Sequence, residues 1–213
     1  MRLGLFGGSF DPVHYGHLIL AEQCREQCQL DEVWFVPARQ PPHKFGLGLS
    51  SAADRMKMLQ LATFDNPVFQ VSDIELRRDG LSYTVETLQQ VHEQWPDREL
   101  FFLLGADSLL DFPNWREPER IVQLAKLVAV NRGGTEIPDK EQLVVQLGRF
   151  IFDRVVWVEM PEIKISATDI RQRVRAGRSI RYLVPPAVEQ YIKTHALYTE
   201  KTSSNPDRSN SVG

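Results

Sequence analysis

Two histidines and a double glycine stand close together near the start of the sequence. His14 and His17 are three residues apart, so on a helix they share one face or the rim of its first turn. Imidazole N–H groups placed there could donate to oxygens that gain charge during phosphoryl or nucleotidyl transfer. The segment Gly7-Gly8-Ser9-Phe10 predicts a tight turn whose amides can approach a phosphate, because glycine has no Cβ. The helix expected after this turn presents its positive end to an anion.

This region could also belong to a dinucleotide-binding motif, a Walker-type motif or a metal site. The sequence has no Gly-x-Gly-x-x-Gly after its first predicted strand and no Walker-type motif, which disfavours a dehydrogenase and a Walker-type NTPase. The two histidines could instead bind zinc, with Asp11 or His43 as a third ligand. Cys24 and Cys28 have no second Cys/His pair at suitable spacing, so we expect reduced, buried thiols rather than a metal site.

A second segment, Ile165 to Arg171, has the residue types of a helix start that could bind phosphate. Ser166 followed by Asp169 is a capping box, which would explain these two residues without any ligand. Thr168 and Arg171 fall within about the first turn, beside a helix N-terminus that attracts anions. The guanidinium of Arg171 can bind oxygens in pairs, so it would suit the β- and γ-phosphates of a nucleotide.

The apolar pattern predicts the elements that must position these groups. Short apolar runs, several of them nearly continuous, are typical of strands in a sheet covered on both faces. Their alternation with amphipathic stretches predicts an α/β fold with a doubly wound, mainly parallel sheet. The expected strands are Leu3–Phe6, Glu32–Val36, Val68–Val71, Leu100–Leu104, Leu127–Val130 and Val155–Val158. The expected helices are Tyr15–Cys28, Ala52–Phe64, Thr84–Trp95, Glu117–Leu124, Lys140–Phe150, Ala167–Ala176 and Pro185–His195.

The expected organisation is one domain over residues 1–198, with a small C-terminal helical part at about 166–198. The polar tail at 199–213 predicts disorder. The loop from Pro37 to Ser50 follows the second strand at the carboxyl edge of the sheet, where open α/β folds bind ligands. We interpret this loop as a mobile substrate loop.

Composition narrows the class of protein. The chain has 213 residues, a net charge of -3 and a pI near 6.0, which argues against broad nucleic-acid or membrane-surface binding. The longest apolar run, Leu100 to Leu104, is too short to span a bilayer, and the first residues lack a signal-peptide pattern. These features predict a cytoplasmic enzyme with no nucleic-acid or membrane partner, and they are compatible with a homo-oligomer.

These motifs resemble the signatures of a known superfamily. The segment from Gly7 to His17 resembles the opening signature of the nucleotidyltransferase superfamily, with His14-Tyr15-Gly16-His17 as its HxGH element. Ile165 to Arg171 resembles the second signature, ISSTxxR, with Ala167 in place of one serine. Further segments narrow the resemblance to the bacterial nicotinate-mononucleotide adenylyltransferases. These segments are Pro41–Lys44, Ser82–Thr84, Gly105–Ser108, Asn114–Arg116 and Val130–Arg132.

The resemblance implies a Rossmann-like nucleotidyltransferase fold and a step of NAD biosynthesis. ATP and nicotinate mononucleotide would give nicotinate adenine dinucleotide and pyrophosphate, with Mg²⁺ carried by ATP and no metal ligand from protein side chains. The catalytic residues it implies are His14, His17 and Arg171. The residues it implies for ATP or phosphate binding are Gly7, Gly8, Ser9, Phe10, Lys44, Asp107, Ser166 and Thr168. Those it implies for nicotinate-nucleotide binding are Tyr83, Thr84, Trp115 and Arg132.

The acceptor phosphate is already an anionic nucleophile, so the expected mechanism needs no general base and no covalent enzyme intermediate. The enzyme would align that oxygen with the α-phosphorus and neutralise the crowded negative charge. Other readings stay open: transfer to nicotinamide mononucleotide or to a phosphopantetheine, a non-catalytic nucleotide-binding module, or a zinc hydrolase. Trp115 could be core packing, Asp107 a helix cap, Lys44 a solvated lysine and Thr84 a helix start.

Overall fold

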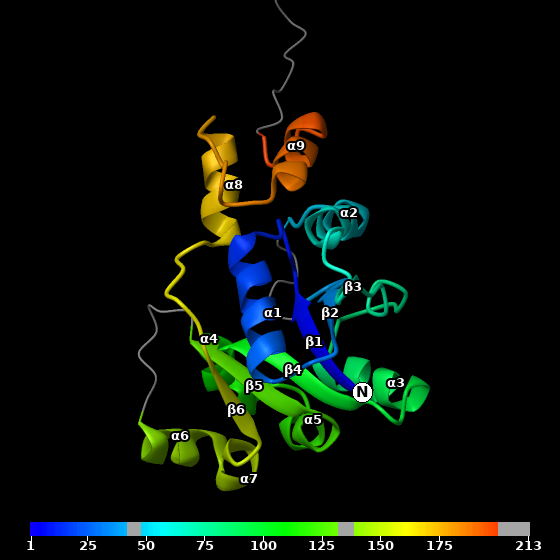
Figure 1. The fold of residues 1–213 in the computed structure, drawn as a ribbon, viewed down its shortest axis with the longest axis vertical. Coiled ribbons are helices and arrows are strands. Elements are labelled where there is room, and N and C mark those ends of the chain that lie inside the picture. Colours follow the sequence, from blue (N-terminus) through cyan, green and yellow to red (C-terminus); the bar gives the residue numbers. More distant parts are fainter. Residues whose placement is uncertain (42–47, 132–138, 200–213) are drawn as a thin grey trace, which may run out of the picture.

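The computed structural model describes residues 1–41, 48–131 and 139–199. Three residues considered above, His43, Lys44 and Arg132, lie outside the described residues. So do part of the predicted substrate loop and the tail from residue 200 onward. Figure 1 shows how the described elements are arranged.

The strands form one parallel sheet in the order β3-β2-β1-β4-β5-β6. Every pairing in it is parallel. The order reverses between β1 and β4, and the crevice beyond the carboxyl ends of such strands is where open α/β sheets bind ligands. The predicted doubly wound α/β fold is confirmed, and the sheet is parallel throughout its described strands.

All of the predicted strands are present, each with bounds within two residues of those expected. Their near-continuous apolar sequences fit strands that are covered on both faces. The strands are β1 (Arg2–Gly8), β2 (Glu32–Pro37), β3 (Phe69–Val71), β4 (Glu99–Gly105), β5 (Lys126–Asn131) and β6 (Val155–Glu159).

The helices agree with the prediction except at two places. The stretch expected as one helix from Lys140 to Phe150 is divided, because Gly148 adopts a φ of 77° that a helix cannot contain. The short helices that follow β4 were not predicted, since six residues are too few to show a helical period. The helices are α1 (Tyr15–Gln27), α2 (Ala52–Thr63), α3 (Thr84–Gln94), α4 (Ala106–Asp111), the 3-10 helix η2 (Phe112–Asn114), α5 (Pro118–Leu124), α6 (Lys140–Leu147), α7 (Arg149–Phe152), α8 (Ala167–Arg175) and α9 (Pro186–Thr194).

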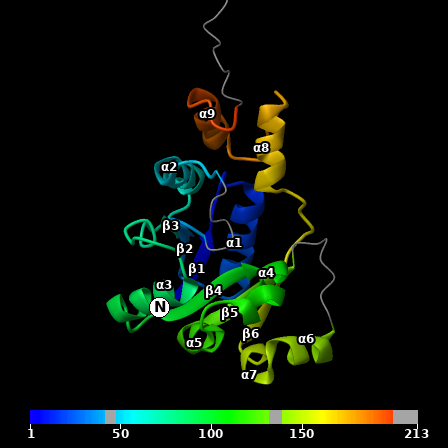
Figure 2. The ribbon, with the colours of Figure 1, turned by 180° about the vertical axis from the view of Figure 1, so that it is seen from behind.

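A hydrophobic core lies on each face of the sheet. Strand β4 shows this clearly, because Phe101 and Leu103 belong to one core while Leu100, Phe102 and Leu104 belong to the other. The first core also contains buried residues of α1, α2, α8 and α9, and the second those of α3, α5, α6 and α7. Figures 1 and 2 show the two faces. This alternation of side chains along the strands determines which helices pack against each face of the sheet.

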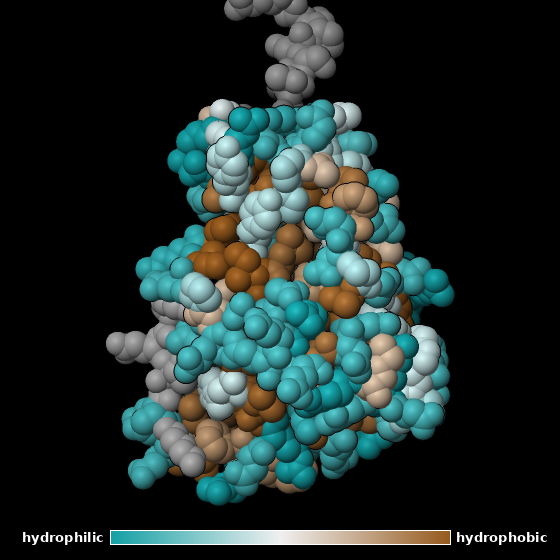
Figure 3. Space-filling view, in the orientation of Figure 1, coloured by the Kyte–Doolittle hydropathy of each residue, from teal (hydrophilic) through white to brown (hydrophobic). Residues whose placement is uncertain are grey.

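Helices α8 and α9 lie beyond the carboxyl end of β1, near the start of α1 (Figure 1). Ile170 of α8 and Ile192 of α9 are fully buried in the core of α1 and α2. The Tyr191 hydroxyl also donates to Asp54 Oδ1 of α2 at 2.9 Å. Figure 3 shows hydrophobic side chains gathered on this side of the molecule where α8 meets the upper end of α1.

The cysteines of α1 are both free thiols buried in the first core, as the sequence predicted. Burial raises the pKa of the Cys24 thiol and of the Cys28 thiol, so both thiols stay protonated near neutral pH. Among the residues that the structure describes, no helix has the length and apolar character needed to cross a bilayer.

Candidate active site

The turn after β1 brings the main chain, rather than the Phe10 ring, to the site. Phe10 has a φ of 48° and its side chain is 1% exposed, packed edge-on against Phe6 with ring centroids 5.4 Å apart. A Cβ on Gly8 would come within 2.9 Å of the Phe10 ring, so this position needs a glycine. Any contact of Phe10 with ATP must therefore come from its main chain.

His14 and His17 are held together at the start of α1. His14 is the N-cap residue, and the two imidazole rings stack with centroids 3.7 Å apart and an interplanar angle of 23°. The His14 main-chain N–H donates to His17 Nδ1 at 3.3 Å. Because Nδ1 accepts this hydrogen bond, the His17 ring carries its proton on Nε2, which can donate to a ligand. His14 is only 2% exposed, so just an edge of its ring can reach a ligand, and the half-buried His17 is the more accessible donor.

Gly16 has a structural role in this arrangement. A Cβ built on Gly16 would lie 3.1 Å from two atoms of the His14 ring and 3.6 Å from the Ile165 carbonyl oxygen. The protein's own atoms therefore come close to this glycine, including the carbonyl of the residue that opens the second motif.

The second motif meets the first across 160 residues of sequence. Arg171 Nη1 donates to the main-chain carbonyl of Asp11 at 2.7 Å, and Nη2 donates to Thr168 Oγ1 at 3.3 Å. Ser166 is the N-cap of α8, where its Oγ accepts the Asp169 N–H at 3.1 Å. The Ser166 half of the predicted capping box is confirmed, and the Ser166 hydroxyl can still donate its own proton to a ligand.

A buried arginine that no local sequence pattern revealed supports the turn after β1. Arg55 of α2 is 2% exposed and donates to the main-chain carbonyls of Ser9 at 2.9 Å, Ala38 at 2.8 Å and Ser50 at 3.2 Å. Burial lowers the pKa of the Arg55 guanidinium, and attraction to Asp11 opposes that effect. Arg55 therefore ties the turn after β1 to the chain after β2.

The zinc reading finds no support among the described residues. They contain no group of three or more His, Cys, Asp or Glu side chains that could hold a metal ion. Asp11 was the candidate third ligand within the first motif, but its carboxylate already accepts hydrogen bonds from the Tyr198 hydroxyl and the Ser50 N–H. The other candidate, His43, lies outside the described residues.

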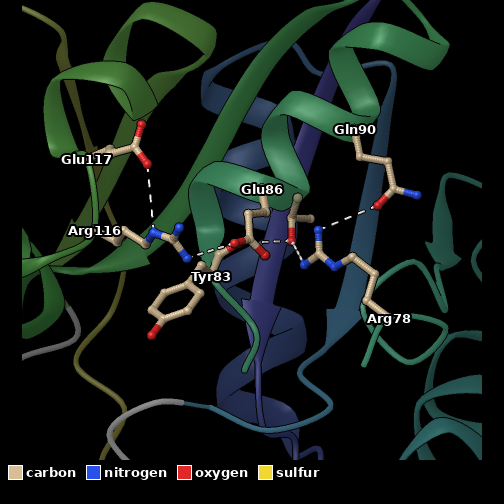
Figure 4. Close-up of polar contacts among 7 residues, drawn as sticks. Arg78, Tyr83, Glu86, Gln90, Arg116 and Glu117 are labelled. Atoms are coloured by element: carbon tan, nitrogen blue, oxygen red, sulfur yellow. Dashed lines mark hydrogen bonds and ion pairs between the residues drawn. The ribbon is translucent and has the colours of Figure 1, made fainter. Parts of the chain in front are cut away.

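The residues expected to bind the acceptor come from neighbouring segments. Tyr83 is the N-cap of α3 and Thr84 its first residue, so both belong to a helix start whose amides lack acceptors within the helix. The Arg116 guanidinium lies 4.6 Å from the centroid of the Tyr83 ring and donates to Glu86 Oε1 at 2.8 Å (Figure 4). The segment carrying Trp115 is thus held against the start of α3.

Trp115 and Asp107 are placed by the elements after β4. The Trp115 ring is half-buried and packs against Phe112 and Phe102, with centroid distances of 5.3 and 5.9 Å. It therefore contributes to the second core, and stacking on a pyridine ring stays a prediction. Asp107 lies in the first turn of α4, where Gly105 is the N-cap. Asp107 is therefore not the N-cap of the helix that follows β4, as the non-ligand interpretation of this residue expected.

A second buried network, also missed from the sequence, supports the start of α3. Glu75 is 7% exposed, and burial raises the pKa of its carboxyl group. The Thr87 hydroxyl donates to Glu75 Oε1 at 2.7 Å, and Arg78 Nη2 donates to Thr87 Oγ1 at 2.7 Å. Ser82 Oγ also accepts the Arg39 N–H at 3.0 Å, which ties the segment before α3 to the loop after β2. Isolated polar residues in a loop carry no local pattern that would reveal this network.

Known proteins resemble this chain in sequence over most of its length. A model of the cytidylyltransferase-like family matches residues 5–173. A probable nicotinate-nucleotide adenylyltransferase of Thermomicrobium roseum is 49% identical over 197 residues, covering 92% of this chain and 91% of the relative. A protein of the same name from Thermus thermophilus is 48% identical over 198 residues, covering 93% of this chain and 100% of the relative.

Among solved structures, a Plasmodium falciparum nicotinic acid mononucleotide adenylyltransferase complexed with NaAD has a TM-score of 0.77. Its sequence identity is 21%, with 92% of this chain and 97% of that chain covered. A likeness at this identity bears on the fold alone, and it confirms the predicted Rossmann-like nucleotidyltransferase fold.

Proposed function

Because the chain belongs to the cytidylyltransferase-like family, we propose that it is an enzyme that transfers the adenylyl group of ATP to nicotinate mononucleotide. The products are nicotinate adenine dinucleotide and pyrophosphate, and the reaction is a step of NAD biosynthesis. The two bacterial relatives bear the name of this activity and align with the chain over nearly their whole length. They support the same reaction for this chain.

One contact carries the proposal: the hydrogen bond of 2.7 Å between Arg171 and the Asp11 carbonyl. It joins the motif that holds the histidine pair to the motif that begins α8. A triphosphate seated between them would meet the His17 ring and the turn after β1 on one side. On the other side it would meet Arg171 and the hydroxyls at the start of α8.

The reaction proceeds by one displacement at the α-phosphorus. An oxygen of the nicotinate mononucleotide phosphate forms a bond to that phosphorus, and the bond to the β-phosphate oxygen breaks as pyrophosphate leaves. The nucleophile is anionic, so no residue has to remove a proton. His17 Nε2–H donates to a phosphate oxygen that gains charge, and Arg171 holds the leaving phosphates. Both groups are held in place before ATP arrives, which lowers the cost of reorganisation.

In the proposed reaction, Mg²⁺ would be bound by oxygens of the triphosphate rather than by protein side chains. The described residues contain no cluster of three or more His, Cys, Asp or Glu side chains, whereas triphosphate oxygens are hard ligands that suit Mg²⁺. When bound, the ion neutralises phosphate charge and orients the triphosphate. The protein's own contribution is then the imidazole, hydroxyl and guanidinium donors.

The choice of nicotinate over nicotinamide rests on the start of α3. The amides near Tyr83 and Thr84 are donors, and the positive end of the helix favours a negative group. A carboxylate meets both conditions, whereas the neutral amide of nicotinamide brings its own N–H donors to the same place. The acid is therefore the acceptor that this helix start supports.

The test is pyrophosphate release by the purified protein with ATP and Mg²⁺ and each of three acceptors. We expect turnover with nicotinate mononucleotide to exceed that with nicotinamide mononucleotide and with phosphopantetheine. A preference for either of the latter would reassign the acceptor and keep the chemistry. ATP binding without turnover on any acceptor would favour a nucleotide-binding module and would overturn the enzyme assignment.

A further inference from the structure

Asp11 connects the end of the described chain to the arginine of the second motif. Its side chain is buried, at 1% exposure, and its Oδ1 accepts the Tyr198 hydroxyl at 2.6 Å across 187 residues of sequence. Its Oδ2 accepts the Ser50 N–H at 3.2 Å, and its main-chain carbonyl accepts Arg171 Nη1 at 2.7 Å. Asp11 therefore accepts hydrogen bonds from three separate segments of the chain.

A specific backbone turn after α9 directs Tyr198 to Asp11. The Leu197 N–H donates to the Ile192 carbonyl at 3.0 Å, which closes the end of the helix. Ala196 and Tyr198 then have φ values of 49° and 63°, in the left-handed region that residues with side chains rarely adopt. Such conformations persist where the surrounding contacts define them strongly. The hydrogen bond to buried Asp11 is a contact of this kind.

The groups around the Asp11 carboxylate favour a hydroxyl that donates. Burial and the negative charge of Asp11 both raise the pKa of Tyr198, so the phenol keeps its proton. The attraction between Arg55 and Asp11 balances charge within the same buried region. Arg55 also donates hydrogen bonds to the carbonyls of Ser9 and Ser50. The Asp11 carboxylate therefore accepts hydrogen bonds from Tyr198 and Ser50 and is attracted to Arg55, while the Asp11 carbonyl accepts a hydrogen bond from Arg171.

We propose that Tyr198 is a positioning residue for adenylyl transfer, which acts through Asp11 on Arg171. The Tyr198 hydroxyl sets the orientation of Asp11, and the Asp11 carbonyl then sets where the guanidinium can meet the leaving phosphates. This assignment rests on the proposed function of the site. It gives the C-terminal turn a role in the reaction as well as in packing, with no contact of Tyr198 to substrate required.

The experiment compares two single hydroxyl deletions. Tyr198→Phe removes the donor to Asp11, whereas Tyr191→Phe removes the hydroxyl that bonds α9 to Asp54. We expect Tyr198→Phe to lower kcat about tenfold with KM for nicotinate mononucleotide changed less than about twofold, because a small misplacement of a reacting group slows turnover. Tyr191→Phe should keep kcat within about twofold of wild type. Thermal unfolding of both variants checks that each is folded.

A double-mutant cycle tests the route through Arg171. If Tyr198 acts by placing Arg171, then adding Tyr198→Phe to Arg171→Ala should lower kcat less than about twofold further. Independent effects would multiply, so a full further loss of about tenfold in the double variant would overturn the proposed route. Equal losses in Tyr198→Phe and Tyr191→Phe would assign the effect to the docking of α9 and overturn it as well.

Failure of this proposal differs from failure of the proposed function. If wild-type protein shows no turnover on any acceptor, the proposed function fails, whatever the variants do. If wild-type protein turns over and Tyr198→Phe matches it, the function stands and the positioning role is lost. ATP affinity measured by calorimetry gives a readout without an acceptor, and Tyr198→Phe should weaken it relative to Tyr191→Phe if Arg171 contacts the triphosphate.

Discussion

Arg171 and Asp11 are joined by a hydrogen bond of 2.7 Å from the guanidinium to a main-chain carbonyl. The same guanidinium donates to Thr168 Oγ1 at 3.3 Å, so part of its donor capacity holds the protein together. A guanidinium has five N–H donors in a planar fork, which leaves others for a phosphate. Arg171 therefore joins the two motifs, and the proposed function gives it a second role, in which it offers charge to the leaving phosphates.

Arg171→Lys should lower kcat about tenfold or more, although the charge is kept. A lysine ammonium cannot reproduce the planar fork that reaches Asp11, Thr168 and a phosphate together. Steady-state pyrophosphate release measures the change. Arg173→Lys is the matched control on the same helix, because Arg173 donates to the Ser179 carbonyl instead. Wild-type turnover in the Arg171 variant would contradict the double role.

His17→Ala should raise the activation free energy by about 3 kcal/mol, which lowers kcat on the order of 100-fold with saturating substrates. The physical reason is the loss of an Nε2–H donor whose tautomer is set by the His14 N–H at 3.3 Å. The measurement is kcat with nicotinate mononucleotide and ATP. His195→Ala, at an exposed ring stacked on Tyr191, should leave kcat unchanged. An unaffected His17 variant would remove this residue from the mechanism.

Gly16→Ala should reduce activity more than stability. The added Cβ would lie 3.1 Å from the His14 ring, which is buried and stacked on His17, so the pair must shift. Alanine also has the better helix propensity by about 1 kcal/mol, which offsets part of any loss of stability. Kinetics and thermal unfolding separate the two effects.

The control for Gly16→Ala is Gly148→Ala, between α6 and α7. Gly148 has a φ of 77°, so an alanine there should cost stability and leave kcat nearly unchanged. If the two variants lost activity in the same proportion to stability, close packing at Gly16 would have no special role.

Glu75→Gln should reduce the dependence of stability on pH. Burial raises the pKa of Glu75 above the ordinary glutamate value of about 4.3, so the folded protein keeps a proton that the unfolded chain releases. The free energy of unfolding therefore falls as pH rises from about 4.3 through the raised pKa. Glutamine cannot titrate. The midpoint of thermal unfolding of the Glu75→Gln variant should therefore fall less than that of wild type between about pH 4 and about pH 7.

Glu93→Gln, on the exposed part of α3, is the charge-matched control for Glu75→Gln. A Glu75 variant with the pH profile of wild type would show that this carboxyl group does not drive the fall in stability. The neutral side chain should also keep the Thr87 hydrogen bond, because an amide oxygen accepts as a carboxylate oxygen does.

Local patterns in the sequence determined much of this protein. The apolar runs predicted each strand of the described residues, the Ser166 cap predicted the start of α8, and the residue types of His14, His17 and Arg171 indicated the chemistry. These features are readable because periodicity, capping and side-chain chemistry depend on neighbours within a few residues. Where the local signal was weak, elements were missed or merged: the short α4 was not predicted, and the stretch that Gly148 divides into α6 and α7 was predicted as one helix.

Only the tertiary structure decided which distant residues touch. The hydrogen bonds that Asp11 accepts from Arg171 and Tyr198 join residues 160 and 187 positions apart, and no local pattern encodes such pairs. Nor does sequence show that Arg55 and Glu75 are buried, since charged residues are usually exposed and their burial depends on what the fold packs over them. The sequence thus determined which chemical groups the site contains. The contacts that hold these groups in position form only after the sheet and its helices have assembled.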